Sequence, residues 1–143
     1  MLNGRDIYKS YRNDGISTEV LKGVDIDILQ GEFACLVGRS GSGKSTLLNV
    51  LSTLTDFDSG ELTYLGTSLG GIKEKELNRL RKNEFSMIFQ FHHLLPYLNA
   101  GENVMLPYLS KLGPVPKQAR IKAEETLARV GLADKFKRLP GQL

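Results

Sequence analysis

The first third of the chain carries the hydrophobic patterns of β-strands. Val24, Ile26 and Ile28 alternate with aspartates, which is the period-two pattern of a strand with one buried face. The run 33–37 is wholly apolar and predicts a short strand buried on both faces. A second apolar strand of the same kind is predicted over 85–89.

Apolar residues that recur every three or four positions predict helices between and after these strands. Residues 47–54 carry leucine and valine at i, i+3, i+4 and i+7, which forms one stripe of a helix. Residues 73–82 are mostly charged and predict a surface helix. Residues 117–130 carry alanine, leucine and valine on one face, with Val130 as the last member of that face.

The segment after position 90 has one clear helix start. Asn99, followed three residues later by Glu102, resembles a capping box with asparagine as the capping residue. We expect a helix to begin there and Pro107 to kink or end it. Gly101 weakens the first turn of this helix, because glycine is a poor helix former.

Eight consecutive residues match the phosphate-binding pattern G-x-x-x-x-G-K-[ST], namely Gly38-Arg39-Ser40-Gly41-Ser42-Gly43-Lys44-Ser45. They lie between an apolar strand and an amphipathic helix, which is the setting that confirms this motif. The glycines let successive backbone N–H groups point toward phosphate oxygens. Lys44 can reach the β- and γ-phosphates, the Ser45 hydroxyl can hold Mg²⁺, and Thr46 lies near the α-phosphate. The motif predicts a nucleoside triphosphate and Mg²⁺ as cofactors.

Composition narrows the class of protein. The 143 residues are 41% hydrophobic and 24% charged, as in a globular chain, and no apolar run approaches the roughly 18 residues of a membrane span. The single cysteine, Cys35, excludes an internal disulfide framework and is expected to be an inert core residue. The net charge is uneven: residues 1–71 carry 6 Lys/Arg and 9 Asp/Glu, and residues 72–143 carry 13 and 7. Because the basic half lacks the spaced aromatic residues of single-strand binders, nucleic acid is not predicted as a partner.

The residues around the loop resemble the nucleotide-binding domain of ABC transporters. Tyr11 lies upstream of the loop, where that family places the aromatic side chain that stacks on adenine. Gln90 ends the run 85–89, as the Q-loop glutamine of the family does. The resemblance implies that Lys44 and Gln90 are catalytic residues and that Ser45 and Gln90 contact Mg²⁺. It also implies that ATP is the nucleotide.

The segment Gln90-Phe91-His92-His93-Leu94-Leu95-Pro96, followed by Glu102-Asn103-Val104, is most similar to the ATPases of lipoprotein-releasing systems, the Lol type. ATPases of macrolide-export and cell-division systems are alternatives. The resemblance implies an α/β P-loop NTPase fold with an antiparallel β part, a P-loop strand and helix, a Q-loop strand and a partial helical subdomain. Residues 1–90 are expected to form the β-subdomain and the first part of the ATPase core. Residues 91–143 are expected to form the Q-loop and the partial helical subdomain.

The resemblance also implies partners and a location. Two ATP-binding subunits pair in this family, and transmembrane permease subunits dock at the Q-loop region, near Leu94 and Leu95. The protein is therefore expected in the cytoplasm, peripheral on the inner face of the cell membrane.

The chain stops just before the position of the family's Leu-Ser-Gly-Gly-Gln signature. It contains neither that signature, nor an apolar strand ending in Asp-Glu, nor the switch histidine. We therefore expect the chain alone to hydrolyse ATP very slowly or not at all, because phosphoryl transfer depends on positioning and charge stabilisation. A sheet without its central strands is expected to oligomerise or rearrange locally. A short, non-catalytic nucleotide-binding or interaction module is the alternative function.

Overall fold

The structure, a computed structural model, describes residues 1–108 and 115–143. It divides the chain into two compact units, Met1–Met87 and Ile88–Leu143. Among the described residues, no helix combines the length and the apolar character needed to cross a membrane.

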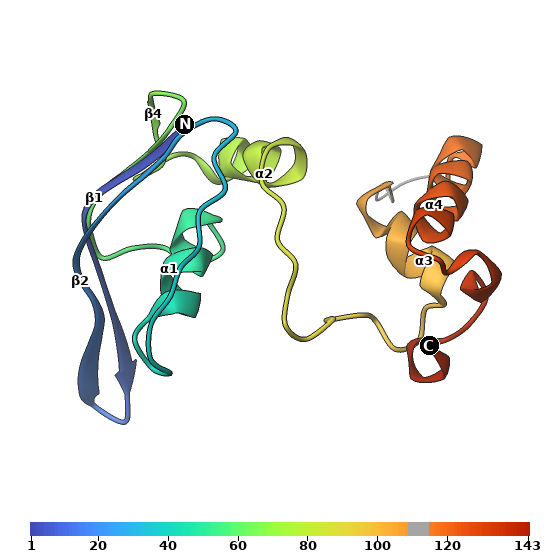
Figure 1. The fold of residues 1–143 in the computed structure, drawn as a ribbon, viewed down its shortest axis with the longest axis horizontal. Helices are drawn as coiled ribbons and strands as arrows, with labels where there is room; N and C mark the ends of the chain where they lie inside the picture. Colours follow the sequence, from blue (N-terminus) through green and yellow to red (C-terminus); the bar gives the residue numbers. More distant parts are fainter. Residues whose placement is uncertain (109–114) are drawn as a thin grey trace. The chain divides into compact units, whose positions relative to one another are not determined.

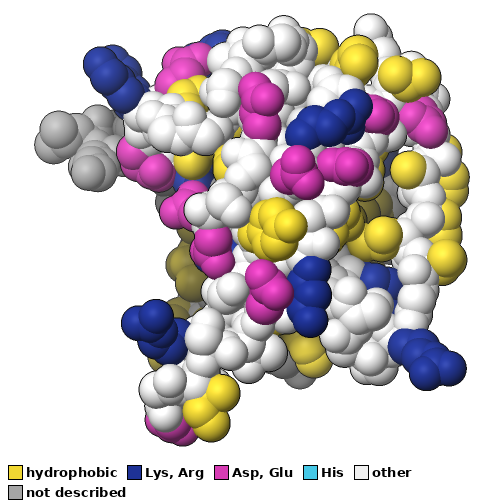
Figure 2. Space-filling model, turned by 90° about the vertical axis from the view of Figure 1, so that its left-hand side faces the viewer, with side chains coloured by type: hydrophobic (Ala, Val, Ile, Leu, Met, Phe, Trp, Pro, Cys, Tyr) yellow, Lys and Arg dark blue, Asp and Glu magenta, His cyan; other side chains and the backbone are white. Residues whose placement is uncertain are grey.

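A four-stranded antiparallel sheet forms the frame of the first unit (Figure 1). Its order is β2 (Ile16–Ile28), β1 (Leu2–Asn13), β3 (Ser59–Tyr64) and β4 (Thr67–Ser68). The predicted alternation at the end of β2 is confirmed, because the apolar residues are partly buried and the aspartates between them are exposed. Arg5 and Asp27 form an exposed ion pair at 2.7 Å across β1 and β2. Figure 2 shows charged side chains of both signs on the side of the molecule that carries the sheet.

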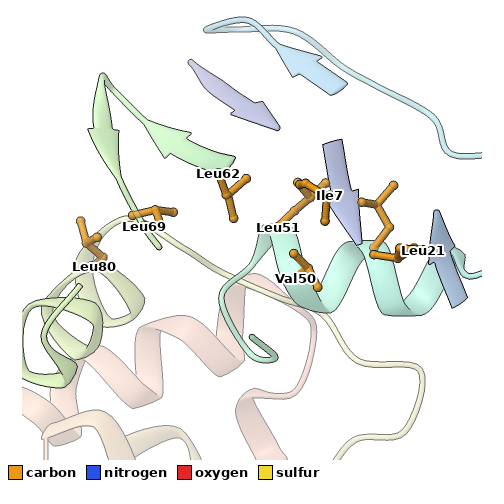
Figure 3. Packing of buried hydrophobic residues seen from close by; sticks show 8 residues of the cluster. Ile7, Leu21, Val50, Leu51, Leu62, Leu69 and Leu80 are labelled. Atoms are coloured by element: carbon orange, nitrogen blue, oxygen red, sulfur yellow. The ribbon is translucent and has the colours of Figure 1, made fainter. Parts of the chain in front are cut away.

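The core of the first unit lies between this sheet and two helices. Helix α1 (Lys44–Leu51) and helix α2 (Glu74–Asn83) contribute leucine and valine side chains that meet those of the strands. Figure 3 shows this cluster, which consists of Ile7, Leu21, Leu47, Val50, Leu51, Leu62, Leu69 and Leu80. Burying one such side chain contributes about 1.5–3 kcal/mol. The predicted stripe is confirmed except for Leu54, which follows the end of α1 and is 45% exposed.

The two short apolar strands predicted over 33–37 and 85–89 are absent from the described structure. Neither segment has regular secondary structure, and Phe33 and Ile88 are 95% and 99% exposed. The prediction of a P-loop strand and a Q-loop strand is therefore wrong here, and Cys35 is exposed rather than part of a core. The physical reason is pairing, since a strand requires hydrogen bonds from a neighbour. The antiparallel sheet of the first unit pairs only β1 to β4.

The second unit is helical in its described residues. It contains α3 (Ala100–Met105), the 3₁₀ turn η1 (Leu106–Tyr108), α4 (Lys117–Arg129) and two further 3₁₀ turns, η2 (Ala133–Lys135) and η3 (Pro140–Gln142). The α4 face built from Ala119, Ala123 and Leu127 is buried, as predicted. The prediction that Val130 belongs to this face is wrong, because α4 ends one residue earlier and Val130 is 66% exposed.

The capping box predicted at the start of α3 is confirmed. The Asn99 side-chain oxygen accepts the Glu102 N–H at 2.9 Å, and the Glu102 carboxylate accepts the Asn99 N–H at 2.8 Å. The helix gives way to a 3₁₀ turn at Leu106, so Pro107 ends it as expected.

Gly101, which weakens the first turn of α3, allows a close approach by another segment. Its N–H donates to the Phe136 carbonyl at 2.9 Å. A Cβ at position 101 would lie closer to the Phe136 ring than van der Waals contact allows. Glycine is a poor helix former at this position, but the absence of a side chain allows the Phe136 ring to pack on α3.

Candidate nucleotide-binding site

The phosphate-binding loop leads directly into helix α1. Gly43 is the capping residue of α1 and has φ of 87°. A Cβ at Gly43 would lie 3.1 Å from the Val20 carbonyl oxygen, so both the backbone conformation and the space favour glycine. The N–H groups in the first turn of a helix have no partner within it and form its positive end. This end of α1 is therefore suited to a phosphate group.

The Lys44 ammonium group lies over the loop that precedes it. Its Nζ donates to the Gly38 carbonyl at 2.9 Å and to the Arg39 carbonyl at 2.6 Å. The Ser42 hydroxyl oxygen is 3.5 Å from the same nitrogen. The lysine charge and the N–H groups of the α1 N-terminus are thus gathered around one short loop.

A hollow of about 590 Å³ lies at this end of α1. Its lining comes from two parts of the first unit: Tyr11 and Val20 of the sheet, and Ser40, Gly41, Gly43, Lys44, Ser45 and Thr46 of the loop and helix. The volume falls in the range of small-molecule sites. The structure thus places Tyr11 beside the phosphate-binding loop, although the whole of β2 and the segment up to Gly38 separate them along the chain.

Two charged residues that the sequence analysis missed lie beside Tyr11. The Lys9 Nζ is 5.6 Å from the centroid of the Tyr11 ring and donates to the Asp58 carboxylate at 3.0 Å. The same carboxylate accepts the Ser10 N–H at 2.6 Å. The hydrogen bond from Lys9, followed by the one from Ser10, lowers the pKa of the Asp58 carboxyl below its ordinary value. No local pattern could have shown this pair, because 49 positions separate its members.

The donor set at the start of α1 fits a magnesium nucleotide. The Ser45 side chain is exposed within the lining of the hollow and offers a hydroxyl oxygen. The described residues contain no cluster of three or more His, Cys, Asp or Glu that could hold a metal. Mg²⁺ is commonly bound through few protein oxygens together with substrate phosphates, and Ser45 suits that mode.

Gln90 belongs to the second unit, whereas the loop and Tyr11 belong to the first. Its expected contacts with Mg²⁺ and water remain predictions. The individual roles in nucleotide binding also remain predictions for Tyr11 on β1 and for the residues of the loop and the first turn of α1. The latter are Gly38, Arg39, Ser40, Gly41, Ser42, Gly43, Lys44, Ser45 and Thr46.

The fold and the loop are those of an ATP-binding cassette. The family model described as ABC transporter matches residues 21–143, and the chain therefore belongs to the ABC transporter family. Its fold is similar to that of the dimeric ATP-binding cassette MJ0796 in a post-hydrolysis state bound to ADP and Pi. The TM-score is 0.88 at 31% sequence identity, over 100% of this chain and 63% of that one.

The curated relatives include ATP-binding proteins of lipoprotein-releasing systems and a macrolide-export protein. The chain is 42% identical to the lipoprotein-releasing system ATP-binding protein LolD 2 of Rhodopirellula baltica, over 100% of this chain and 58% of that protein. It is 38% identical to LolD of Alcanivorax borkumensis, over 100% and 62%. It is also 42% identical to the macrolide export protein MacB of Azoarcus sp., over 96% and 21%. The chain thus spans less than two thirds of the length of these relatives.

The comparisons confirm the resemblance to the ABC family and the α/β P-loop class of the fold. They also confirm the similarity to the Lol branch, with a macrolide-export relative present as expected.

Proposed function

We propose that this chain is the ATP-binding part of a transporter ATPase that powers the release of lipoproteins from the inner membrane. The main observation in support of ATP binding is the hollow that is lined by both Tyr11 and the phosphate-binding loop. The names of the Lol relatives support lipoprotein release as the process that the ATPase serves.

In this proposal each part of the site has a separate task. The N–H groups at the start of α1 and the Lys44 ammonium hold the β- and γ-phosphates. The Ser45 hydroxyl holds Mg²⁺, which neutralises charge on the phosphate oxygens when it is bound. The Tyr11 ring supports the adenine, and Gln90 contacts Mg²⁺ and the attacking water.

The proposed partners are a second ATP-binding subunit and the transmembrane permease subunits. The dimeric state of the similar cassette supports the first partner. The permease subunits would dock at the Q-loop region of the second unit, and this docking would hold the protein on the inner face of the cell membrane.

We expect Lys44→Ala to weaken MgATP binding by about ten- to hundredfold. The reason is the loss of a charge-assisted hydrogen bond to phosphate, which contributes about 1.5–3 kcal/mol. Isothermal titration calorimetry of the purified chain measures this change.

Lys82→Ala is the matched control for this substitution. Lys82 is an exposed lysine in α2, and its replacement is expected to leave the affinity unchanged. Equal affinities for the Lys44→Ala variant and the unaltered chain would contradict the proposed site.

We expect the isolated chain to bind MgATP with a turnover below about 0.01 s⁻¹, against 1–10³ s⁻¹ for typical enzymes. The 143 residues contain no apolar strand ending in Asp-Glu, no Leu-Ser-Gly-Gly-Gln signature and no switch histidine. The chain by itself therefore does not provide the groups that we expect to activate water and to cover the phosphates. Phosphate release, followed with Lys44→Ala as the blank, measures this rate. A turnover near 1 s⁻¹ that disappears in the blank would show that the chain is a complete catalyst.

Macrolide export is the second candidate function. The observation in its favour is the 42% identity to the MacB protein of Azoarcus sp., which equals the identity to the Rhodopirellula relative. Co-purification with the permease subunits of one system or the other distinguishes the two candidates.

A further inference from the structure

We infer that Asp58, acting through Lys9, is a positioning residue that aims the Tyr11 ring at the base of the bound nucleotide. The inference rests on the proposed function, because it needs a nucleotide in the hollow beside the phosphate-binding loop. It adds a residue outside the lining of the hollow to the groups that determine nucleotide affinity.

The first observation is an irregularity of the sheet next to Tyr11. Lys9 pairs with Leu21 and Ser10 pairs with Glu19, so the register shifts there and Val20 is left without a partner in the β1–β2 ladder. Such β-bulges redirect side chains and occur often beside active sites. Regular pairing resumes with Ser10 opposite Glu19 and continues with Tyr11 opposite Thr18. The bulge therefore determines where Tyr11 and Val20 enter the lining of the hollow.

The second observation is that Asp58 holds this bulge from the other side of β1. Its carboxylate accepts the Ser10 N–H at 2.6 Å and the Lys9 ammonium at 3.0 Å. Its own N–H donates to the Tyr8 carbonyl at 2.8 Å. Asp58 therefore binds three successive residues of β1 immediately before Tyr11.

The third observation links Lys9 to the ring itself. The Lys9 side chain is only 15% exposed, and its ammonium lies 5.6 Å from the Tyr11 ring centroid, within the range of a cation–π contact. Because Asp58 fixes the ammonium, the contact restrains the ring. A ring that is held in place before binding loses less conformational freedom when a base stacks on it.

The experiment compares two ligands that differ in the base. Isothermal titration calorimetry is performed with MgATP and with magnesium tripolyphosphate, which has the phosphates but no base. We expect Asp58→Asn to weaken MgATP binding by roughly three- to tenfold, part of the loss caused by removing an aromatic stacking partner. Binding of tripolyphosphate is expected to be unchanged. Lys9→Met is expected to behave in the same way, and Lys9→Arg to retain the affinity of the unaltered chain.

Two further variants distinguish positioning from a general loss of structure. In a Tyr11→Ala background, Asp58→Asn is expected to cause no additional loss, because the residue acts through the ring. Asp56→Asn is the matched control, since Asp56 is an exposed carboxylate two positions away. Its replacement is expected to leave both affinities unchanged.

Three outcomes would overturn the inference. Unchanged MgATP binding by Asp58→Asn, together with a loss in Tyr11→Ala, would show that Asp58 does not position the ring. An equal loss for both ligands would show that Asp58 only stabilises the fold. Failure of the unaltered chain to bind either ligand would overturn the proposed function and this inference with it.

Discussion

Replacing Gly60 with alanine is expected to lower the free energy of unfolding of the first unit by about 3 kcal/mol or more. Gly60 has φ of 103°, a conformation that side chains rarely adopt. An added Cβ would lie 2.6 Å from the Arg5 carbonyl oxygen and closer still to that of Asp6. Both obstacles are backbone atoms of β1, so relief requires that β1 and β3 move apart.

Urea unfolding followed by far-ultraviolet circular dichroism measures this loss. Gly15→Ala is the matched control. Gly15 also has positive φ, at 80°, but nothing lies within 4 Å of an added Cβ there. The control is expected to cost about 1–2 kcal/mol, the cost of the backbone conformation alone. Equal losses in the two variants would show that close approach of β1 to Gly60 contributes nothing.

The close approach at Gly60 also explains an irregularity of β1. The β1–β3 register shifts between Arg5 and Tyr8, and Asp6 there has a positive φ of 48°. The Asp6 N–H donates to the Asp25 side chain at 2.8 Å instead of joining a regular ladder. Gly60 and Asp25 therefore accommodate the same irregularity from the two sides of β1.

The parts of this fold that could be predicted from the sequence depend on short-range patterns. The alternation at the end of β2, the stripe of α1 and the capping box at Asn99 each involve neighbouring residues, and the structure contains all three. The phosphate-binding loop is likewise a contiguous motif. The apolar runs 33–37 and 85–89 failed as strands because an apolar run does not specify a pairing partner.

The candidate site also contains residues that could be predicted from the sequence and residues that could not. The loop could be found from its spacing, and Tyr11 through the family resemblance. The contribution of Val20 could not be predicted, since it depends on a register shift between β1 and β2. The pairing of Lys9 with Asp58 could not be predicted either, because an ion pair between residues 49 positions apart leaves no periodic pattern in the sequence.

Asn103→Ala is expected to release the segment that precedes α3 and to cost about 2–4 kcal/mol of local stability. The nitrogen of the buried Asn103 amide lies within hydrogen-bond distance of three carbonyl oxygens, which share its two N–H donors. They belong to Leu95 at 3.1 Å, Leu98 at 2.9 Å and Asn99 at 3.1 Å. Its oxygen accepts the Leu95 N–H at 2.8 Å. Removing this amide takes the partner from the Leu95 N–H and the Leu98 carbonyl, whereas the Leu95 and Asn99 carbonyls still accept backbone N–H groups. A buried group that is left unsatisfied costs about 1–3 kcal/mol.

Hydrogen exchange at the Leu95 amide tests this expectation most directly, because that N–H loses its acceptor in the variant. Exchange is expected to accelerate by about thirtyfold or more, the factor that corresponds to about 2 kcal/mol. Asn83→Ala is the control: Asn83 is exposed and makes one side-chain bond, to the Arg79 carbonyl at 2.9 Å, so its loss should change stability by less than about 0.5 kcal/mol. Unchanged exchange at Leu95 would show that the segment is held without Asn103. Faster exchange would show that Asn103 holds the segment around Leu95, the region where we propose that the permease docks.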